Sequence, residues 1–352
     1  MFSFLTSAYQ TEQYIRETID SVLAQTRPDW QLVVVDNGFS DEMAAIVGEY
    51  TSDPRIVLIR QQNAGMGGGV NAAAAVATGR YVCPLDSDDL LERDYCERIG
   101  ELLDSEPAID AVGADATLFW DATPTDRYFA SIGRGVIDRG EYFDSIGRRD
   151  IPDPRRSVSF AEMLEKGVPH YAGAFRRDLW HAHGGFEPTA DVEADAALWL
   201  RLAAAGSDIR VLPTKLVRHR MRALSLSHDL TTLGRFEKRL MDAYLLVGRE
   251  CGLSEAELAK SRIMRLQRQH RALCAARSAL LERDLSTART AAHEAFRQRP
   301  TLRSAVVLTM LYVSPGVLRV MHPIKNRAEN AARRVRFAGA VRHQRAISEG
   351  RL

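Results

Sequence analysis

Residues 81–91 read YVCPLDSDDLL, and three carboxylates within four positions separate two apolar runs. The first run, from Tyr81 to Leu85, has the composition of a buried strand. Asp86, Asp88 and Asp89 follow it directly. Like charges this close repel one another, and removing even one of them from water is costly. The pattern therefore indicates that a positive group binds at the end of this strand.

The first 90 residues alternate between strand-like and helix-like segments. Segments with apolar residues at helical spacing separate the continuous apolar runs, which are residues 2–6, 31–36, 55–60 and 80–86. Such alternation predicts a parallel sheet that helices cover on both faces. In sheets of this kind, ligands bind beyond the carboxyl ends of the strands. Asp36 and Asp86 both lie at such ends.

Beyond residue 105 the pattern changes twice. A strand-like segment at 109–120 precedes residues 121–157, whose Arg, Asp, Gly and Pro content predicts a long loop. Two short strands at 209–213 and 215–221 are expected to close this domain. From about residue 226 only helical spacing remains, over residues 235–251, 256–281 and 286–298, and a basic tail follows. We therefore expect a catalytic α/β domain over residues 1–225 and a helical C-terminal region over residues 226–352.

Bulk properties exclude several classes of protein. The net charge of +1 gives no reason to expect nucleic acid as a partner. The four cysteines lack CxxC spacing and indicate buried thiols in a reducing compartment. The chain opens without the basic and apolar segments of a signal peptide, and its longest apolar stretch, residues 304–321, is interrupted by Pro315 and Gly316. A cytoplasmic location is expected.

The acidic cluster admits more than one chemistry. A D-x-D at a strand end suits Mg²⁺ or Mn²⁺, whose remaining ligands would be water and phosphate oxygens, but it could also cap the next helix. An EF-hand loop is excluded because Leu90 and Leu91 occupy the positions of an oxygen ligand and of a required glycine. A phosphatase that uses Asp86 as nucleophile stays open as a further alternative.

The glycine-rich stretch at 63–71, NAGMGGGVN, matches no phosphate-binding fingerprint. A G-x-G-x-x-G motif from Gly65 would need glycine where Val70 stands, and no Gly-Lys-Ser/Thr follows. These glycines are typical of a helix start that lets the backbone approach another group closely.

Taken in order, these segments resemble a family 2 glycosyltransferase. The resemblance covers residues 1–225, and its components are SFLTSAY (3–9), residues 14–41, residues 59–90, HGGFEP (183–188) and EADAALWLRLAAAG (193–206). It implies the GT-A fold, which is a Rossmann-like, nucleotide-binding, mostly parallel mixed sheet with helices on both faces. Here an all-helical region is expected to follow.

The resemblance assigns a nucleotide-sugar site. The end of the first strand and the Asp of the second strand would hold the base, the N-A-G stretch would contribute to the donor site, and the D-x-D would contact the ribose and the metal-bound diphosphate. By position Asp88 is the expected ligand of Mn²⁺ or Mg²⁺. The expected nucleotide-sugar contacts are Thr6, Ala8, Tyr9, Asp36, Asn63, Gly65, Asp86, Ser87 and Arg220.

The family's catalytic base is an Asp shortly before a Trp on a helix. Counting back from Trp199, Asp195 takes this position, Ala194 replaces the usual Glu, and Glu193 stands one residue early. Asp195 is therefore the expected base, with Glu193 as the open alternative. Two acidic residues at the start of a helix could also simply interact favourably with the helix macrodipole, without any role in chemistry.

The chain departs from the family pattern at several places. Gly69 and Val70 stand where a basic residue is common, and Phe39 intrudes into the usual D-D-G-S. Arg222 replaces the late histidine, and Arg220 with Arg222 could neutralise the diphosphate. Three further histidines near the acceptor-side G-G-F match no metal motif and are expected to be structural or to contact the acceptor; they are His170, His181 and His183.

The resemblance implies an inverting, metal-dependent hexosyltransferase-type enzyme that uses a nucleoside-diphosphate sugar, with uridine as the default base. Its acceptor would be a saccharide or a lipid-linked saccharide of a cell-surface polysaccharide or glycoconjugate. A non-catalytic binding or scaffolding protein on a decayed transferase domain is the alternative. The basic tail suggests peripheral contact with the inner face of the plasma membrane. The alternative is that the helical region packs on the catalytic domain or on a second subunit in a homodimer.

Overall fold

The computed structural model describes residues 1–120, 137–138, 153–169, 173–188, 192–221 and 233–319. The chain forms two compact units. The first unit comprises Met1–Phe119, Ile137–Arg220 and Lys238–Leu253, and the second includes Ser254–Leu352. The predicted boundary at residue 225 lies outside the described residues, as does most of the predicted loop at 121–157.

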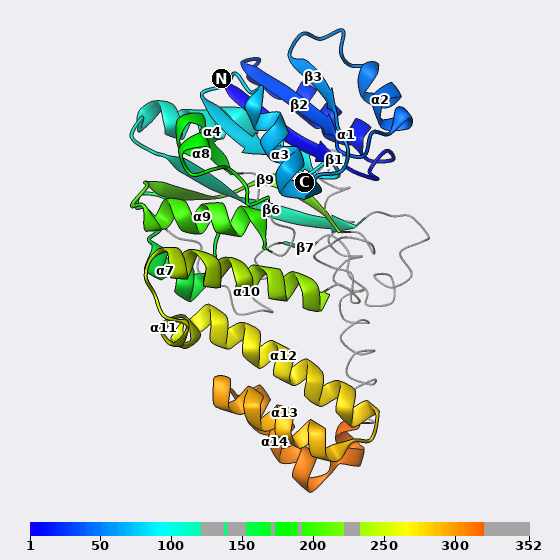
Figure 1. Ribbon diagram of the computed structural model, residues 1–352, viewed down its shortest axis with the longest axis vertical. Coiled ribbons are helices and arrows are strands. Elements are labelled where there is room, and N and C mark those ends of the chain that lie inside the picture. Colours follow the sequence, from blue (N-terminus) through cyan, green and yellow to red (C-terminus); the bar gives the residue numbers. More distant parts are fainter. Residues whose placement is uncertain (121–136, 139–152, 170–172, 189–191, 222–232, 320–352) are drawn as a thin grey trace, which may run out of the picture. The chain divides into compact units, whose positions relative to one another are not determined.

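The first four strands are parallel and alternate with helices, as the sequence predicts (Figure 1). Ser40 begins α2 as its N-cap, because its Oγ accepts a hydrogen bond from the Met43 N–H. The alternation places the carboxyl ends of these strands at one edge of the sheet. The elements in order are β1 (Phe2–Ala8), α1 (Ile15–Leu23), β2 (Trp30–Asp36), α2 (Asp41–Gly48), β3 (Ile56–Arg60), α3 (Gly65–Ala75) and β4 (Tyr81–Pro84).

Five further strands turn this parallel half into a mixed sheet, which confirms the expected fold class. Among the described residues the strand order is β3-β2-β1-β4-β8-β6-β9-β5, with β7 paired to β6. β8 is antiparallel to both β4 and β6. The added strands are β5 (Leu90–Leu91), β6 (Ala111–Trp120), β7 (Ile137–Asp138), β8 (Ala174–Arg176) and β9 (Ile209–Met221).

The prediction of two closing strands is wrong, because β9 is one strand from Ile209 to Met221. Pro213 lies within it. A proline removes only one donor from a ladder and its φ fits an extended chain, so it does not have to end a strand outside the centre of a sheet.

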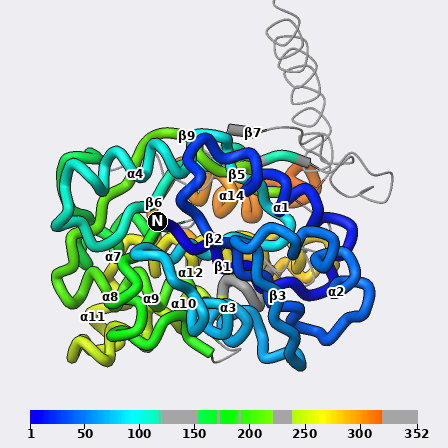
Figure 2. The backbone as a smooth tube through the Cα atoms, turned by 90° about the horizontal axis from the view of Figure 1, so that it is seen from above, coloured from blue at the N-terminus to red at the C-terminus, as the bar shows by residue number. Residues whose placement is uncertain are grey.

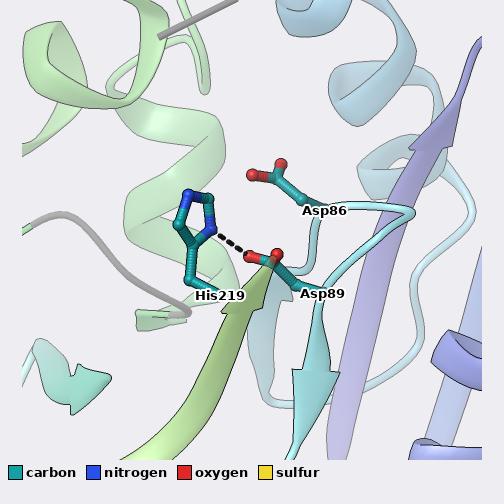
Figure 3. A group of neighbouring side chains, drawn as sticks. All are labelled: Asp86, Asp89 and His219. Carbon is teal, nitrogen blue, oxygen red and sulfur yellow. Dashed lines mark hydrogen bonds and ion pairs between the residues drawn. The ribbon is translucent and has the colours of Figure 1, made fainter. Parts of the chain in front are cut away.

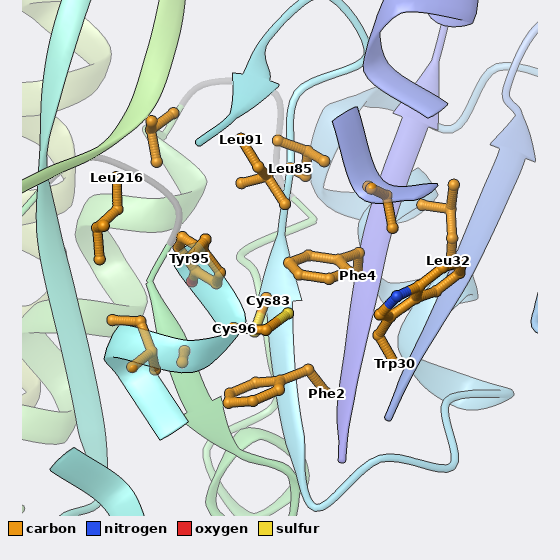
Figure 4. Close-up of a cluster of buried hydrophobic side chains, with 14 of the residues drawn as sticks. Phe2, Phe4, Trp30, Leu32, Cys83, Leu85, Leu91, Tyr95, Cys96 and Leu216 are labelled. Carbon is orange, nitrogen blue, oxygen red and sulfur yellow. The ribbon is translucent and has the colours of Figure 1, made fainter. Parts of the chain in front are cut away.

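Helices cover both faces of the parallel strands. On one face Phe2 and Phe4 of β1 pack in a buried cluster with Ile15 of α1 and with Tyr95 and Ile99 of α4 (Tyr95–Ser105) (Figure 4). On the other face α3 lies beside β1 and β2 (Figure 2). The remaining helices of this unit are α7 (Phe160–Lys166), α8 (Arg177–Ala182), α9 (Ala194–Ala204) and the part of α10 (Leu233–Glu250) that begins at Lys238.

The glycines of α3 allow the close backbone approach that the sequence predicts. A Cβ at Gly69 would overlap the Oγ of Ser7 in β1, and a Cβ at Gly67 would overlap the carbonyl oxygen of Glu187. α3 can therefore lie closer to β1 than a helix with side chains at these positions could.

Gly69→Ala should lower the free energy of unfolding by about 1–3 kcal/mol because the new methyl group overpacks this contact. Gly48→Ala is the matched control, since no atom lies within 4 Å of its added Cβ. It should raise stability by about 0.5–1 kcal/mol, the usual gain for replacing glycine in a helix. Urea unfolding of both variants measures the difference, and equal effects would contradict the close approach.

The described part of the second unit is all helical, as expected. It contains α11 (Glu255–Lys260), α12 (Arg262–Leu281), α13 (Leu285–Gln298) and α14 (Leu302–Val313). Ser261 ends α11 and begins α12, where its Oγ accepts from the Met264 N–H, so the expected helix over 256–281 is divided. A small apolar core joins the last three helices through Ala276, Leu280, Ala288, Ala292 and Leu311.

The expectation of four buried thiols is half correct. Cys83 and Cys96 are buried in the first unit, whereas Cys251 and Cys274 are exposed. All four are free thiols.

Candidate active site

The ends of β1 and β2 meet at one edge of the sheet. Ala8 pairs with Asp36 as the last residues of the two strands. Both are buried, and Thr6 is also buried, with its Oγ1 lacking a hydrogen-bond partner among the described residues. The Tyr9 side chain is exposed, and its ring lies against Gly38. The residues that the sequence assigns to the nucleotide base thus lie close together.

Asp36 is held in place by its neighbours. One carboxylate oxygen accepts from the Ser40 N–H at 2.9 Å, and the other accepts from Arg60 Nε at 3.0 Å. Arg60 also lies over the ring of Phe39, 4.2 Å from its centroid. Phe39 has φ of 53°, which is unusual for a bulky residue, and its ring is exposed. The intruding phenylalanine therefore forms an aromatic wall beside Asp36.

Asn37 links this edge to the N-A-G stretch, a role that the sequence did not indicate. Its Nδ2 donates to the Gly65 carbonyl at 2.8 Å, and its Oδ1 accepts from the Ala64 N–H at 3.1 Å. The Asn63 Oδ1 accepts from the Gly65 N–H, and Gly65 has φ of 74°, which favours glycine. Asn63 and Gly65 are thereby fixed next to the end of β2.

The acidic cluster lies between β4 and β5. Asp86 is exposed, whereas Ser87, Asp88 and Asp89 are buried. The Ser87 hydroxyl lies 2.8 Å from that of Thr11. Desolvation by the surrounding walls, together with the charges of Asp89 and Asp88, raises the pKa of Asp86 to about 8. Desolvation and the neighbouring carboxylates therefore disfavour the charge of Asp86 strongly enough for it to keep a proton at neutral pH, and a bound cation could take the place of that proton.

Asp89 joins this cluster to β9. Its two carboxylate oxygens bond to Nδ1 of His219 at 2.7 Å and to the N–H of Arg220 at 2.8 Å. Burial disfavours a charge on His219, but the charge and hydrogen bond of Asp89 outweigh it and raise the pKa of His219 to about 9. Asp89 and His219 were both missed as site residues, although Asp89 directly follows the D-x-D.

Arg220 is buried at the base of the cluster. Its Nε donates to the carbonyl oxygen of Asp88 at 2.8 Å, and its Nη2 donates to Glu17 at 2.8 Å. Its guanidinium also lies 4.7 Å from the centroid of the Phe119 ring. Arg220 therefore holds the backbone of the D-x-D loop, and a contact with the diphosphate stays a prediction. Arg222, the other expected cation, lies outside the described residues.

Asp86, Asp89 and His219 offer ligand atoms that all lie within 4.8 Å of one another (Figure 3). The Asp86 carboxylate points toward the His219 ring, and Asp89 bonds to one nitrogen of that ring (Figure 3). Metal-binding histidines usually have their second nitrogen held by a carboxylate in this way. The residues present thus fit a divalent cation. Asp88, the ligand expected from the sequence, stands between them in the chain, and its role stays a prediction.

The two candidate bases lie at the start of α9 and differ in their surroundings. Glu193 is the N-cap residue and is held by Arg239 of α10. Asp195 is in the first turn, and its Oδ1 accepts from the Ala196 N–H at 2.6 Å. Burial raises the pKa of Asp195 to about 6, and burial together with the charge of Asp195 raises the pKa of Glu193 to about 7.

The first turn of α9 packs on α3, since a Cβ at Gly67 would lie 3.5 Å from the Cβ of Ala194. The charge of Asp195 also contributes to the raised pKa of Asp86, so the candidate base and the acidic cluster interact electrostatically. At a pKa of about 6, Asp195 is largely ionised at neutral pH and can accept a proton.

The G-G-F segment is fixed by α3. Asn71 accepts from the Phe186 N–H at 2.9 Å and donates to the Phe186 carbonyl at 2.7 Å. His181 and His183 lie just before it, at the end of α8. His170 lies outside the described residues.

One family model and several curated proteins are similar to part of this chain. Residues 3–149 match the model of glycosyl transferase family 2. The chondroitin synthase of Escherichia coli is 37% identical over 207 residues, which cover 58% of this chain and 27% of that protein. The chain spans about half of the length, or less, of the first curated relatives that it matches.

Two solved structures have a similar fold. One is S. aureus TarS 1-349 in complex with UDP-GlcNAc, with a TM-score of 0.54 and 17% identity, covering 97% of this chain and 92% of that chain. The other is the mannosyltransferase PcManGT from Pyrobaculum calidifontis in complex with GDP-Man and Mn²⁺, with a TM-score of 0.54 and 19% identity, covering 95% of this chain and 86% of that chain. At these identities the likeness concerns the fold.

In the parts of the chain that the structure describes, no helix combines the length and hydrophobicity needed to cross a bilayer.

The mixed sheet, the acidic cluster after β4 and the family match agree with one another. Residues 3–149 of the chain match the model of glycosyl transferase family 2, and the fold is of the GT-A type.

Proposed function

We propose that the protein transfers a sugar from a nucleoside-diphosphate sugar to an acceptor hydroxyl, with inversion at the anomeric carbon. The product would be a cell-surface polysaccharide or glycoconjugate. The proposal depends most on one observation: Asp86, Asp89 and His219 bring possible ligand atoms within 4.8 Å of one another after β4. This cluster lies in a chain whose residues 3–149 match the model of glycosyl transferase family 2. A UDP-sugar is the default donor.

The donor would lie along the carboxyl ends of β1, β2 and β4. The exposed ring of Tyr9 offers a stacking surface for the base next to Asp36, and Asp86 with Ser87 would contact the ribose and diphosphate. The other contacts that the family pattern assigns are Thr6, Ala8, Asn63, Gly65 and Arg220. Thr6 and Ala8 are buried and would act by shaping the backbone that the base approaches.

Asp86 and His219 would hold Mn²⁺ or Mg²⁺, with Asp89 orienting the imidazole. Asp88 would be a further ligand, as the family pattern assigns it. When bound, the cation would neutralise the charge that builds on the departing diphosphate. Carboxylate and imidazole donors together are compatible with Mn²⁺, while Mg²⁺ prefers oxygen ligands.

The proposed reaction needs one proton transfer. A carboxylate oxygen of Asp195 takes the proton of the acceptor hydroxyl, and the acceptor oxygen forms a bond to the anomeric carbon. The bond from that carbon to the diphosphate oxygen breaks on the opposite face, and its electron pair leaves with the nucleoside diphosphate. Glu193 is paired with Arg239, whereas Asp195 has the position that the family pattern gives to the base when counted back from Trp199, so Asp195 is the base that we propose.

A donor panel tests this proposal. Thermal shifts with UDP, GDP and TDP and their sugars, with and without Mn²⁺, should identify one base, and the matching sugar nucleotide should release nucleoside diphosphate in the presence of acceptor saccharides. Binding of a nucleotide without turnover of any donor would support the scaffolding alternative. Metal-dependent release of phosphate from simple esters would support a phosphatase instead.

The second unit would contact an anionic membrane surface. α14 packs on its neighbours through Leu311, while Leu302, Val306 and Val313 are exposed at spacings that place them together on one outer face. Between Ser254 and Arg319 there are 12 Lys and Arg residues against 5 Asp and Glu residues. An apolar helix face within a basic unit is typical of peripheral membrane binding.

The second unit could instead pack on a second copy of the chain in a homodimer. Sedimentation velocity would detect such a dimer.

The double substitution Leu302→Gln with Val313→Gln should reduce co-sedimentation with liposomes that contain phosphatidylglycerol by about tenfold, because two apolar side chains no longer enter the interface. The control is Leu23→Gln with Val76→Gln, two exposed apolar residues of the first unit. Equal sedimentation of both variants and the unchanged protein would rule out membrane contact through α14.

A further inference from the structure

Two ion pairs connect α10 to α9 within the first unit. Arg239 donates to Glu193, just before α9, with Nη2 to Oε2 at 2.7 Å. Arg201, further along α9, donates to Glu250, the last residue of α10, with Nε to Oε2 at 2.9 Å. The residue that precedes α9 pairs with the earlier residue of α10, and the later residue of α9 pairs with the last residue of α10. The two helices therefore lie side by side and point the same way (Figure 1).

The contact at the start of α9 is the more extensive one. Arg239 also donates from Nε to Oε2 of Glu193 at 3.2 Å, and its carbonyl oxygen accepts from the Glu193 N–H at 3.1 Å. Glu193 is buried, and its own carbonyl accepts the first helical bond of α9, from the Ala197 N–H. Side chain and backbone of Glu193 are thus fixed two residues before Asp195.

Charged residues on several described elements act on this turn. The charge of Asp195 acts on Glu193 and on Asp86, and Arg239 favours the ionised form of both Glu193 and Asp195. α3, which also packs on α9, has no titratable side chain. On α7, which packs there too, Glu162 pairs with Arg156 and Lys166. Without the guanidinium of Arg239, the carboxylates of Glu193 and Asp195 would repel each other with less positive charge to compensate them.

We propose that Arg239 is a positioning residue for Asp195: by clamping Glu193 it fixes the first turn of α9, which carries Asp195. The inference rests on the proposed function, in which Asp195 is the base. It places part of the catalytic machinery on α10, outside the residues that match the family model. Arg239 itself would touch neither donor nor acceptor.

Arg239→Met tests the inference, with Arg201→Met as the matched control, since both remove one guanidinium from the contact between α9 and α10. Arg239→Met should lower kcat by about 10–100-fold with little change in the KM for the donor, because misplacing a base costs rate more than binding. Arg201→Met should keep the kcat of the unchanged protein within about threefold, since Arg201 pairs with Glu187 and Glu250 and its loss leaves the clamp on Glu193 in place.

The pH profile separates positioning from general loss of structure. A base acts when unprotonated, so activity rises with pH through the pKa of Asp195, about 6 in the unchanged protein. In Arg239→Met the loss of the positive charge raises this pKa, so the rise of activity with pH, the acidic limb of the profile, should move to higher pH. The loss of kcat should therefore be about fivefold larger at pH 6 than at pH 8.5. Arg239→Lys, which keeps a charge, should restore the position of the limb. An unmoved limb would overturn the inference.

A second measurement needs no substrate. A carboxyl group whose pKa is raised by folding stabilises the protein below its unfolded pKa, and this stabilisation is lost as the pH rises through its folded pKa. The loss falls between about pH 4 and pH 7 for Asp195 and Glu193 in the unchanged protein. In Arg239→Met this loss of stability should continue above pH 7, because both carboxyl groups keep their protons to higher pH.

The melting temperature of Arg239→Met should therefore fall further below that of the unchanged protein at pH 8 than at pH 5. For Arg201→Met, the difference in melting temperature from the unchanged protein should be the same at pH 5 and at pH 8. If this difference is the same at both pH values for Arg239→Met as well, the clamp does not act on these carboxylates. If the pH dependence appears but the unchanged protein turns over no donor, the clamp exists and the proposed function fails.

Discussion

Asp195→Asn is expected to lower the rate of sugar transfer by about 10²–10⁴-fold, the usual contribution of a positioned general base. The amide keeps the size of the side chain and can still accept the bond from the Ala196 N–H, but it cannot take a proton. Affinity for the nucleoside diphosphate should stay nearly unchanged, since the proposed role of Asp195 is to take a proton from the acceptor. Turnover and calorimetry on the same preparation measure the two effects.

The pH dependence gives the same variant a second test. In the unchanged protein, activity should increase from pH 5 to pH 7, because the pKa of Asp195 is about 6 and its ionised form is the active one. The residual activity of Asp195→Asn should lack this limb. Glu193→Gln is the control, since it removes the other candidate base. If Glu193→Gln abolishes transfer and Asp195→Asn does not, the base is Glu193.

Asp88→Ala is expected to lower the affinity for a nucleoside diphosphate in the presence of Mn²⁺ by at least about 10–100-fold, as for other changes at a metal site. Without Mn²⁺ the two proteins should bind the nucleotide with similar, weak affinity. Titration calorimetry with and without Mn²⁺ measures the difference. The unchanged protein with added EDTA should behave like the variant.

Asp104→Ala provides the control for loss of a negative charge. Asp104 is an exposed residue of α4 that pairs with Arg27, and it lies outside the cluster. This variant should keep the full effect of Mn²⁺ on affinity. An Asp88→Ala protein that still gains affinity from Mn²⁺ would show that Asp86 and His219 hold the cation without Asp88.

Local patterns in the sequence predict most of the parallel half of the sheet. Apolar runs become β1 to β4 because strands buried on both faces need apolar side chains along their whole length. Ser40 begins a helix because its hydroxyl satisfies a backbone N–H. The acidic residues after β4 stand out because three charges interrupt an apolar stretch. Each of these signals involves residues near one another in the chain.

The parts that the sequence does not predict depend on contacts between distant residues. Asp89 meets His219 across 130 positions, and Glu193 meets Arg239 across 46. Neither pair has a local pattern, because the folded sheet and the packing of α10 on α9 bring them together. Pro213 likewise indicates a strand end locally, yet pairing along β9 keeps the chain extended.

A crystal structure with Mn²⁺ and the nucleoside diphosphate that gives the largest thermal shift would test the central claim most directly. The anomalous signal of manganese should lie beside Asp88 and Asp86, next to the diphosphate, with Asp195 facing the sugar end of the site. A nucleotide bound elsewhere, or manganese absent from this cluster at saturating concentration, would contradict the account.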